Sequence, residues 1–184
     1  DCNRYLCNVV SGGDGGFIWN KLFRAKLFDG VRFSDEIVYS EDLLFNFVIS
    51  QKAEKISFVN EEKYNYFHKY LSGYAWVLND HSFDMVRVFE EMFKYDMAPE
   101  VYDRCVRGYM TAAFTLLSGV LTNEKYFYKY DEIRAEILRF KKRIFLEKRY
   151  PLKYKAKTLV LWLCPGLYNL MIRGIRKAKD KKPN

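Results

Sequence analysis

The sequence predicts a mixed α/β segment followed by a mostly α-helical region. Up to about residue 75, short apolar runs alternate with glycine-rich or Asp-Gly breaks, a pattern typical of short strands and helices. From there to residue 138 apolar residues recur at helical spacing, and from residue 139 the helical pattern continues in a basic stretch. We therefore divide the chain into an α/β part (1–75), a helical extension (76–138) and a basic amphipathic tail (139–184).

The elements expected in the first part follow from turn residues and apolar patterns. Four glycines in six residues cannot sustain a regular element, and Ser40 suits the N-cap of a helix with an apolar face. Short runs of β-branched and aromatic residues predict strands. In chain order we expect the end of a helix (1–10), a turn (11–16), a strand running into a helix (17–28), a helix (41–53) and two strands (56–59 and 64–67).

Three helices are expected in the second part. Over 82–95 every third or fourth residue is apolar, as in an amphipathic helix. The stretch 100–121 is nearly continuous in apolar character after Gly108, which indicates a helix buried on most sides. A third helix is expected over 123–143, where acidic and basic residues are spaced for exposed ion pairs.

Charge is distributed unevenly along the chain. The 184 residues carry a net charge of +8, yet residues 139–184 hold fifteen Lys/Arg against two acidic residues, a charge of +13. This tail predicts an anionic partner, and we expect no nucleic acid because no base-stacking or groove-reading motif accompanies the charge. Two interpretations stay open: an amphipathic helix in the interface of an anionic membrane, or a final helix packed on the body with a solvated basic end.

The cysteines and the apolar runs bear on the compartment. Cys2, Cys7, Cys105 and Cys164 show no metal-ligand spacing, and each is expected to be a small apolar filler with a reduced thiol. The longest charge-free runs, 108–123 and 158–172, hold 16 and 15 residues, fewer than the roughly 20 that a span needs. We therefore expect a cytoplasmic protein, or one peripheral at the inner face of a membrane.

Two short motifs supply the candidate functional residues. Trp19, Asn20 and Lys21 place an indole, an amide and an ammonium side by side, and Glu41 and Asp42 open a helix about twenty residues later. This combination suits a site that holds a polar acceptor molecule and removes a proton from it. The acid pair has two interpretations. It complements the helix dipole, or one carboxylate is a general base whose pKa burial raises against the opposing helix N-terminus.

The order and spacing of four segments resemble the acceptor half of a family 2 glycosyltransferase with the GT-A fold. In that family a W-N-K-L-[FY] segment precedes an E-D motif at a helix start, and an apolar helix and a K-x-Y-x-Y segment follow. The matching segments here are 19–23, 39–42, 43–50 and 63–72. The resemblance covers about 17–75 and implies a partial GT-A, Rossmann-like half-domain of a bacterial enzyme of cell-envelope polysaccharide biosynthesis.

The resemblance also implies roles for individual residues. Asp42 resembles the catalytic base that deprotonates the acceptor hydroxyl, and Glu41 resembles its neighbour in contact with the acceptor. Trp19 would form part of the acceptor surface, or else be a core aromatic. Asn20 and Lys21 would line the site or contact a phosphate, with a solvated Lys21 as the alternative. His68 and Lys69 fall where family members often carry basic residues near the donor diphosphate.

One part of the family pattern is missing. The sequence contains no Asp-x-Asp motif, which in the family holds a divalent cation, Mg²⁺ or Mn²⁺, on the diphosphate of the nucleotide-sugar donor. We therefore expect this chain to be part of a longer protein and to transfer no sugar alone. The complete enzyme would transfer a sugar, with inversion, to a polysaccharide or lipid-linked acceptor. The alternative is a non-catalytic helical module that docks on a membrane or a partner through 139–184.

Overall fold

The computed structural model describes residues 1–11, 15–61, 63–65 and 77–180, with side chains up to residue 175. The chain forms two compact units, Asp1–Tyr109 and Met110–Asn184. The long helix α4 (Pro99–Val120) contributes residues to both units. The predicted boundary near residue 75 falls in 66–76, outside the described residues.

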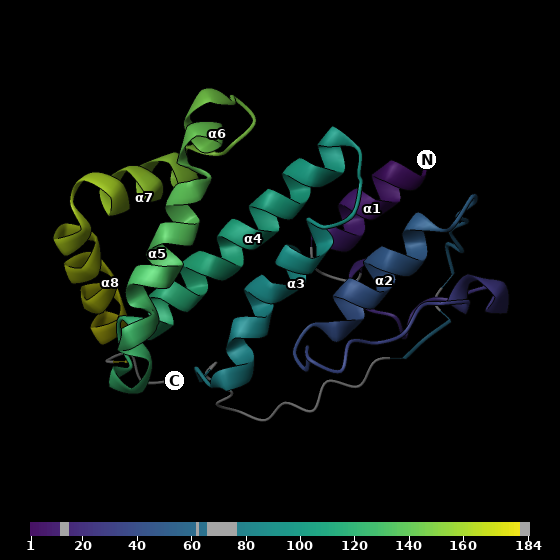
Figure 1. The fold of residues 1–184 in the computed structure, drawn as a ribbon, viewed down its shortest axis with the longest axis horizontal. Helices are drawn as coiled ribbons and strands as arrows, with labels where there is room; N and C mark the ends of the chain where they lie inside the picture. Colours follow the sequence, from purple (N-terminus) through teal and green to yellow (C-terminus); the bar gives the residue numbers. More distant parts are fainter. Residues whose placement is uncertain (12–14, 62, 66–76, 181–184) are drawn as a thin grey trace. The chain divides into compact units, whose positions relative to one another are not determined.

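The first unit is built around helix α2 (Glu41–Gln51). This helix packs against α1 (Cys2–Val10) and against α3 (Asp84–Met92), as Figure 1 shows. Short 3₁₀ helices, η2 (Ala25–Phe28) and η3 (Asp80–Phe83), lie in the connections. The predicted helices over 1–10, 41–53 and 82–95 are thus confirmed.

A buried amide joins α1 to α2. Asn46, fully buried, accepts hydrogen bonds from the Tyr5 hydroxyl at 3.5 Å and from Ser50 Oγ at 3.2 Å. Its Nδ2 donates to the Gly15 carbonyl at 2.6 Å. Because buried polar groups are costly unless they are hydrogen-bonded, this network fixes the chain after α1 against the middle of α2.

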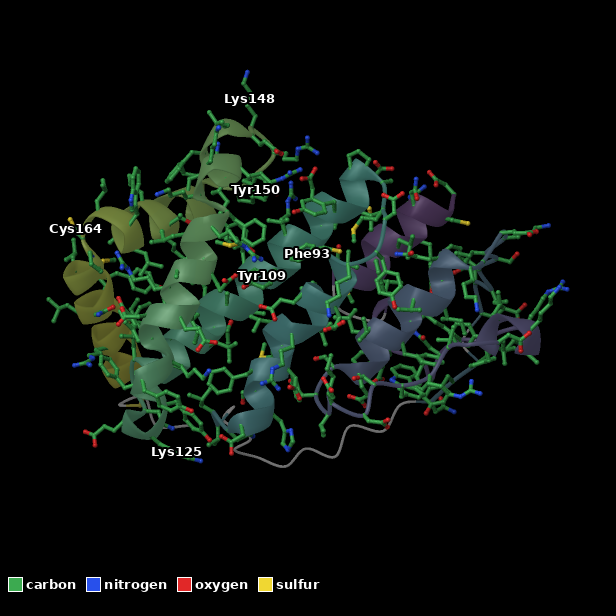
Figure 2. The ribbon with its side chains drawn as sticks, in the orientation of Figure 1. Phe93, Tyr109, Lys125, Lys148, Tyr150 and Cys164 are labelled. Carbon is green, nitrogen blue, oxygen red and sulfur yellow. The ribbon has the colours of Figure 1, made fainter. Side chains whose placement is uncertain are left out.

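The first part of α4 packs closely on α3. A Cβ added at Gly108 would lie 2.4 Å from the Phe89 ring and 3.2 Å from the Val10 carbonyl oxygen. Phe93 lies with its ring centroid 5.9 Å from that of Tyr109, the pair labelled in Figure 2. The predicted helix over 100–121 is confirmed, and Gly108 lets its backbone approach α3.

The expectation of an α/β, Rossmann-like half-domain is wrong: the structure is all-helical, with no strand or sheet among the described residues. Residues 17–28 form turns, with hydrogen bonds such as Lys21 N–H to the Ile18 carbonyl at 3.2 Å, and then η2. Their apolar side chains Ile18, Phe23 and Leu27 pack on Phe45 of α2 instead of joining a sheet. Residues 56–59 are irregular, and 64–67 lie partly outside the described residues.

The second unit consists of the end of α4 and five further helical segments. The predicted helix over 123–143 is interrupted: a 3₁₀ turn precedes α5, and α6 begins after a break at Phe140. An exposed ion pair joins Glu136 to Arg139 at 3.3 Å, as the spacing predicts. The segments are η4 (Glu124–Lys129), α5 (Tyr130–Arg139), α6 (Lys141–Leu146), α7 (Leu152–Leu163) and α8 (Pro165–Asp180).

From residue 152 the basic tail forms α7 and α8, which pack on each other and meet at a corner marked by Cys164 (Figure 2). Only Cys164 separates the two helices, and Pro165 starts α8. Proline suits this first helical position because its missing N–H would have no intrahelical partner there. In the part of the chain that the structure describes, no helix is long and apolar enough to cross a bilayer.

Candidate functional site

Helix α2 begins at a strained residue. Ser40 has φ 68° and ψ 24°, the left-handed region, and within the described ranges it is the one residue other than glycine with a positive φ. Its carbonyl accepts the first helical hydrogen bonds, from the amides of Leu43 at 3.1 Å and Leu44 at 3.4 Å. Ser40 is therefore the N-cap residue, as predicted, but its hydroxyl makes no capping bond. Such strain persists only where the surroundings hold it.

A buried carboxylate holds the chain immediately before Ser40. Asp84, 1% exposed at the start of α3, accepts hydrogen bonds from the backbone N–H of Val38 at 3.0 Å and of Tyr39 at 3.2 Å. The Arg87 guanidinium pairs with its other oxygen at 3.3 Å. Asp84 thus fixes the approach to α2 from a position more than forty residues away in sequence.

Sequence reasoning missed Asp84, although a signal was present. Asp84, Val88 and Met92 are spaced by four and are all buried, so they share the core side of α3. An acidic residue on the apolar face of a helix requires hydrogen-bond donors, because an unpaired buried charge is costly. Here the donors are the backbone amides of the loop before α2.

The acid pair occupies the first turn of α2, as predicted. Glu41 and Asp42 are both partly buried. Burial raises the pKa of Glu41 above its ordinary value, and the charge and hydrogen bonding of Asp42 raise it further against a backbone hydrogen bond that lowers it. A first-turn carboxylate that served only the helix dipole would have a lowered pKa. Glu41 therefore holds a proton more readily than a free glutamate does, the property that a general base needs.

A hollow of about 950 Å³ lies in the first unit, along α2. Leu44, Phe45 and Val48 line one side of it. Glu41 precedes them by three, four and seven residues, so it shares their face of α2. Glu41 therefore lies about one helical turn before the lining residues of α2, although neither Glu41 nor Asp42 is among the described residues that line the hollow.

The rest of the lining mixes charged residues with apolar and uncharged ones such as Val31, Ile37 and Ser34. The lining includes three basic and three acidic residues: Arg32, Arg87, Lys94, Glu36, Glu90 and Glu91. A lining that combines apolar side chains of α2 with charged side chains suits a ligand that has both apolar and polar groups. The volume of the hollow is in the usual range of small-molecule sites, roughly 300–1,000 Å³.

Trp19, Asn20 and Lys21 form a separate cluster. Phe17 and Tyr64 both stack on the Trp19 ring, with centroid distances of 5.4 and 4.6 Å. Lys21 Nζ donates to Asn20 Oδ1 at 2.7 Å and to the Phe17 carbonyl. None of the three predicted residues is among the described residues that line the hollow. In the structure Lys21 thus contacts Asn20, and Trp19 belongs to an aromatic stack with Phe17 and Tyr64.

The structure does not test the remaining basic candidates, His68 and Lys69, or the metal. His68 and Lys69 lie outside the described residues. His81 is exposed, with Nδ1 3.7 Å from the Asp84 carboxylate. Within the described ranges no group of three His, Cys, Asp or Glu residues is placed to hold a metal ion. The Mg²⁺ or Mn²⁺ expected for the complete enzyme stays a prediction.

Comparison with known proteins adds no relative. No protein-family model matches the chain, and no curated protein or solved structure matches it.

Proposed function

We propose that this chain supplies the acceptor site of a sugar transferase, with Glu41 and Asp42 as the groups that take the proton of the acceptor hydroxyl. One observation carries the proposal: the acid pair opens helix α2, Glu41 shares the face of α2 that contributes to the lining of the hollow, and burial raises the pKa of Glu41. The resemblance of the motifs around 19–23 and 39–42 to family 2 glycosyltransferases supports sugar transfer in particular.

The reaction is an inverting single displacement. The acceptor oxygen attacks the anomeric carbon of the donor sugar, its proton passes to a carboxylate of the acid pair, and the bond to the nucleoside diphosphate breaks with its electron pair on the diphosphate. The resemblance assigns the base to Asp42, whereas the raised pKa is that of Glu41. The donor is bound by residues outside this chain.

The test is sugar transfer by a protein that joins this chain to its donor-binding segment. Asp42→Asn should lower kcat about 10²–10⁴-fold, the usual contribution of a general base. Glu41→Gln should shift the acidic limb of the pH–rate profile. Asp35→Asn, an exposed carboxylate of the loop before α2, is the matched control and should change neither.

Two results would oppose the proposal. Full activity of Asp42→Asn would remove the acid pair from the chemistry. Turnover of nucleotide sugars by the 184-residue chain alone would show that donor and acceptor are both bound here, contrary to the expectation drawn from the missing Asp-x-Asp.

The alternative function, docking through 139–184, concerns the second unit and is favoured by a separate observation, the exposed apolar face of α7 and α8. Docking should not change in Asp42→Asn, so the two functions can be tested independently.

A further inference from the structure

Helix α8 presents an apolar face to solvent. Leu167, Leu170 and Met171 are 51%, 70% and 51% exposed, whereas Tyr168 is 4% exposed. Because residues three and four apart share a helix face, the three exposed side chains form one stripe. A surface helix ordinarily buries such a stripe against the core. Here the buried Tyr168 packs with its ring centroid 6.2 Å from that of Phe114 of α4, and the described residues leave the stripe largely uncovered.

Helix α7 has an exposed apolar stripe of its own. Leu152, Leu159 and Leu163 are exposed and recur at intervals of seven and four residues, while Thr158 and Leu161 are buried. Trp162 is also partly exposed, and Lys141 Nζ lies 4.5 Å from its ring centroid. An indole with a cation beside it is typical of the level of lipid headgroups.

The charge around these stripes has one sign. No Asp or Glu occurs between Glu147 and Asp180, and nine Lys or Arg occur in 148–179. Lys153, Lys157 and Arg173 are exposed on the same two helices. Exposed apolar side chains with cations beside them complement the surface of an anionic membrane, where charged headgroups cover the apolar acyl chains.

We propose that α7 and α8 dock in the plane of an anionic lipid bilayer. The apolar face, defined as Leu152, Leu159, Leu163, Leu167, Leu170 and Met171, enters the boundary between headgroups and acyl chains. The basic side chains meet the anionic headgroups. A second copy of the chain is a poor occupant, because it would bring two acid-free basic surfaces together. The proposal does not depend on the acid pair of the first unit.

The test is sedimentation of the 184-residue chain with sucrose-loaded vesicles of phosphatidylcholine alone or with about one quarter phosphatidylglycerol, at low salt and at about 0.5 M salt. We expect binding to the anionic vesicles that falls at high salt, with at least about tenfold weaker binding to the neutral ones. Leu167→Gln/Leu170→Gln/Met171→Gln should weaken anionic binding at least about tenfold. Because these side chains are exposed, the helical circular dichroism should not change.

Two control variants match the substitutions. Phe58→Gln/Val59→Gln removes equally exposed apolar residues from the first unit and should not affect binding. Lys153→Gln/Lys157→Gln/Arg173→Gln should reduce binding to anionic vesicles, whereas Arg24→Gln/Lys26→Gln/Lys55→Gln should reduce it much less.

Three outcomes would overturn the proposal. The first is no sedimentation with anionic vesicles at low salt. The second is undiminished binding of Leu167→Gln/Leu170→Gln/Met171→Gln. The third is self-association in analytical ultracentrifugation that the same variant abolishes while vesicles bind neither protein; the face would then be an interface between copies of the chain.

Discussion

The loop before α2 depends on one buried carboxylate, so Asp84→Ala tests the construction of the site directly. The substitution removes the acceptor of two backbone amides, those of Val38 and Tyr39, at 3.0 and 3.2 Å. It also removes the partner of Arg87. Because alanine is a good helix former, α3 itself should remain intact, and its other contacts with the loop need not change.

The magnitude follows from these contacts. A hydrogen bond to a charged acceptor contributes about 1.5–3 kcal/mol, so two bonds set a ceiling of roughly 3–6 kcal/mol. The side chains of Val38 and Tyr39 are 58% and 47% exposed, so water can reach their amides once the loop loosens. The Arg87 side chain is 59% exposed, and an ion pair with so exposed a partner adds little to the free energy of unfolding. We expect a loss of about 2 kcal/mol in the free energy of unfolding.

The assay combines urea unfolding with amide hydrogen exchange. Asp84→Ala should lower the unfolding free energy and accelerate exchange at Val38 and Tyr39. Asp84→Asn keeps an acceptor oxygen and should lose less than the alanine variant. Asp96→Ala, an exposed carboxylate in the turn after α3, is the control. Unchanged exchange at 38 and 39 in Asp84→Ala would refute the proposed clamp.

Two further predictions concern the same unit. In the folded protein the pKa of Glu41 is raised above 4.5, so the folded protein binds this proton more tightly than the unfolded chain does. The contribution of Glu41 to the free energy of unfolding is therefore complete at low pH and is lost as the pH rises through the folded-state pKa. Glu41→Gln should therefore raise the free energy of unfolding near pH 7 but not near pH 4, as urea titrations at both pH values will show. Gly108→Ala should destabilise by about 1–3 kcal/mol despite the better helix propensity of alanine, because its Cβ meets the buried Phe89 ring. The loss should shrink in a Phe89→Leu background, and an equal loss there would contradict the steric cause.

Periodicity located most of the helices. The helix over 41–53 was predictable because an N-cap residue precedes two acids and an apolar run, and α2 is found there. Over 123–143 the same reasoning failed in part, since apolar spacing cannot reveal the break at Phe140, where the backbone leaves the helical region. Helix ends depend on local backbone geometry more than on the average pattern of a segment.

The strands were mispredicted for a physical reason. A run such as 56–59 is apolar and β-branched, which fits a strand, but a strand forms only when a neighbouring segment accepts its backbone hydrogen bonds. Among the described residues no segment pairs with 56–59, and Phe58 remains exposed with its ring edge toward Tyr5. Over 17–28 the apolar side chains found a different partner, the face of α2 that carries Phe45.

The candidate site was predictable only where it is local in sequence. The acid pair and the helix that carries it are adjacent, so their joint placement followed from capping rules. The contacts of Asp84 with the loop before α2, and the hollow lined in part by Phe45, bring together segments that are far apart in sequence, so no short motif reveals them. Trp19 shows the converse: its motif is distinctive, yet its ring is engaged by Phe17 and Tyr64 instead of lining the hollow.

The start of α2 departs from what stability alone would select. Ser40 in the left-handed region costs of order 1–3 kcal/mol, and its hydroxyl does not return a capping bond. The pKa of Glu41 is raised although a helix N-terminus should lower it, so burial beside Asp42 outweighs the dipole. Two local rules are thus broken at adjacent residues, and Asp84 holds the chain that leads into them. Departures of this kind gather at functional sites, and they support the proposal that Glu41 and Asp42 take the proton of the acceptor.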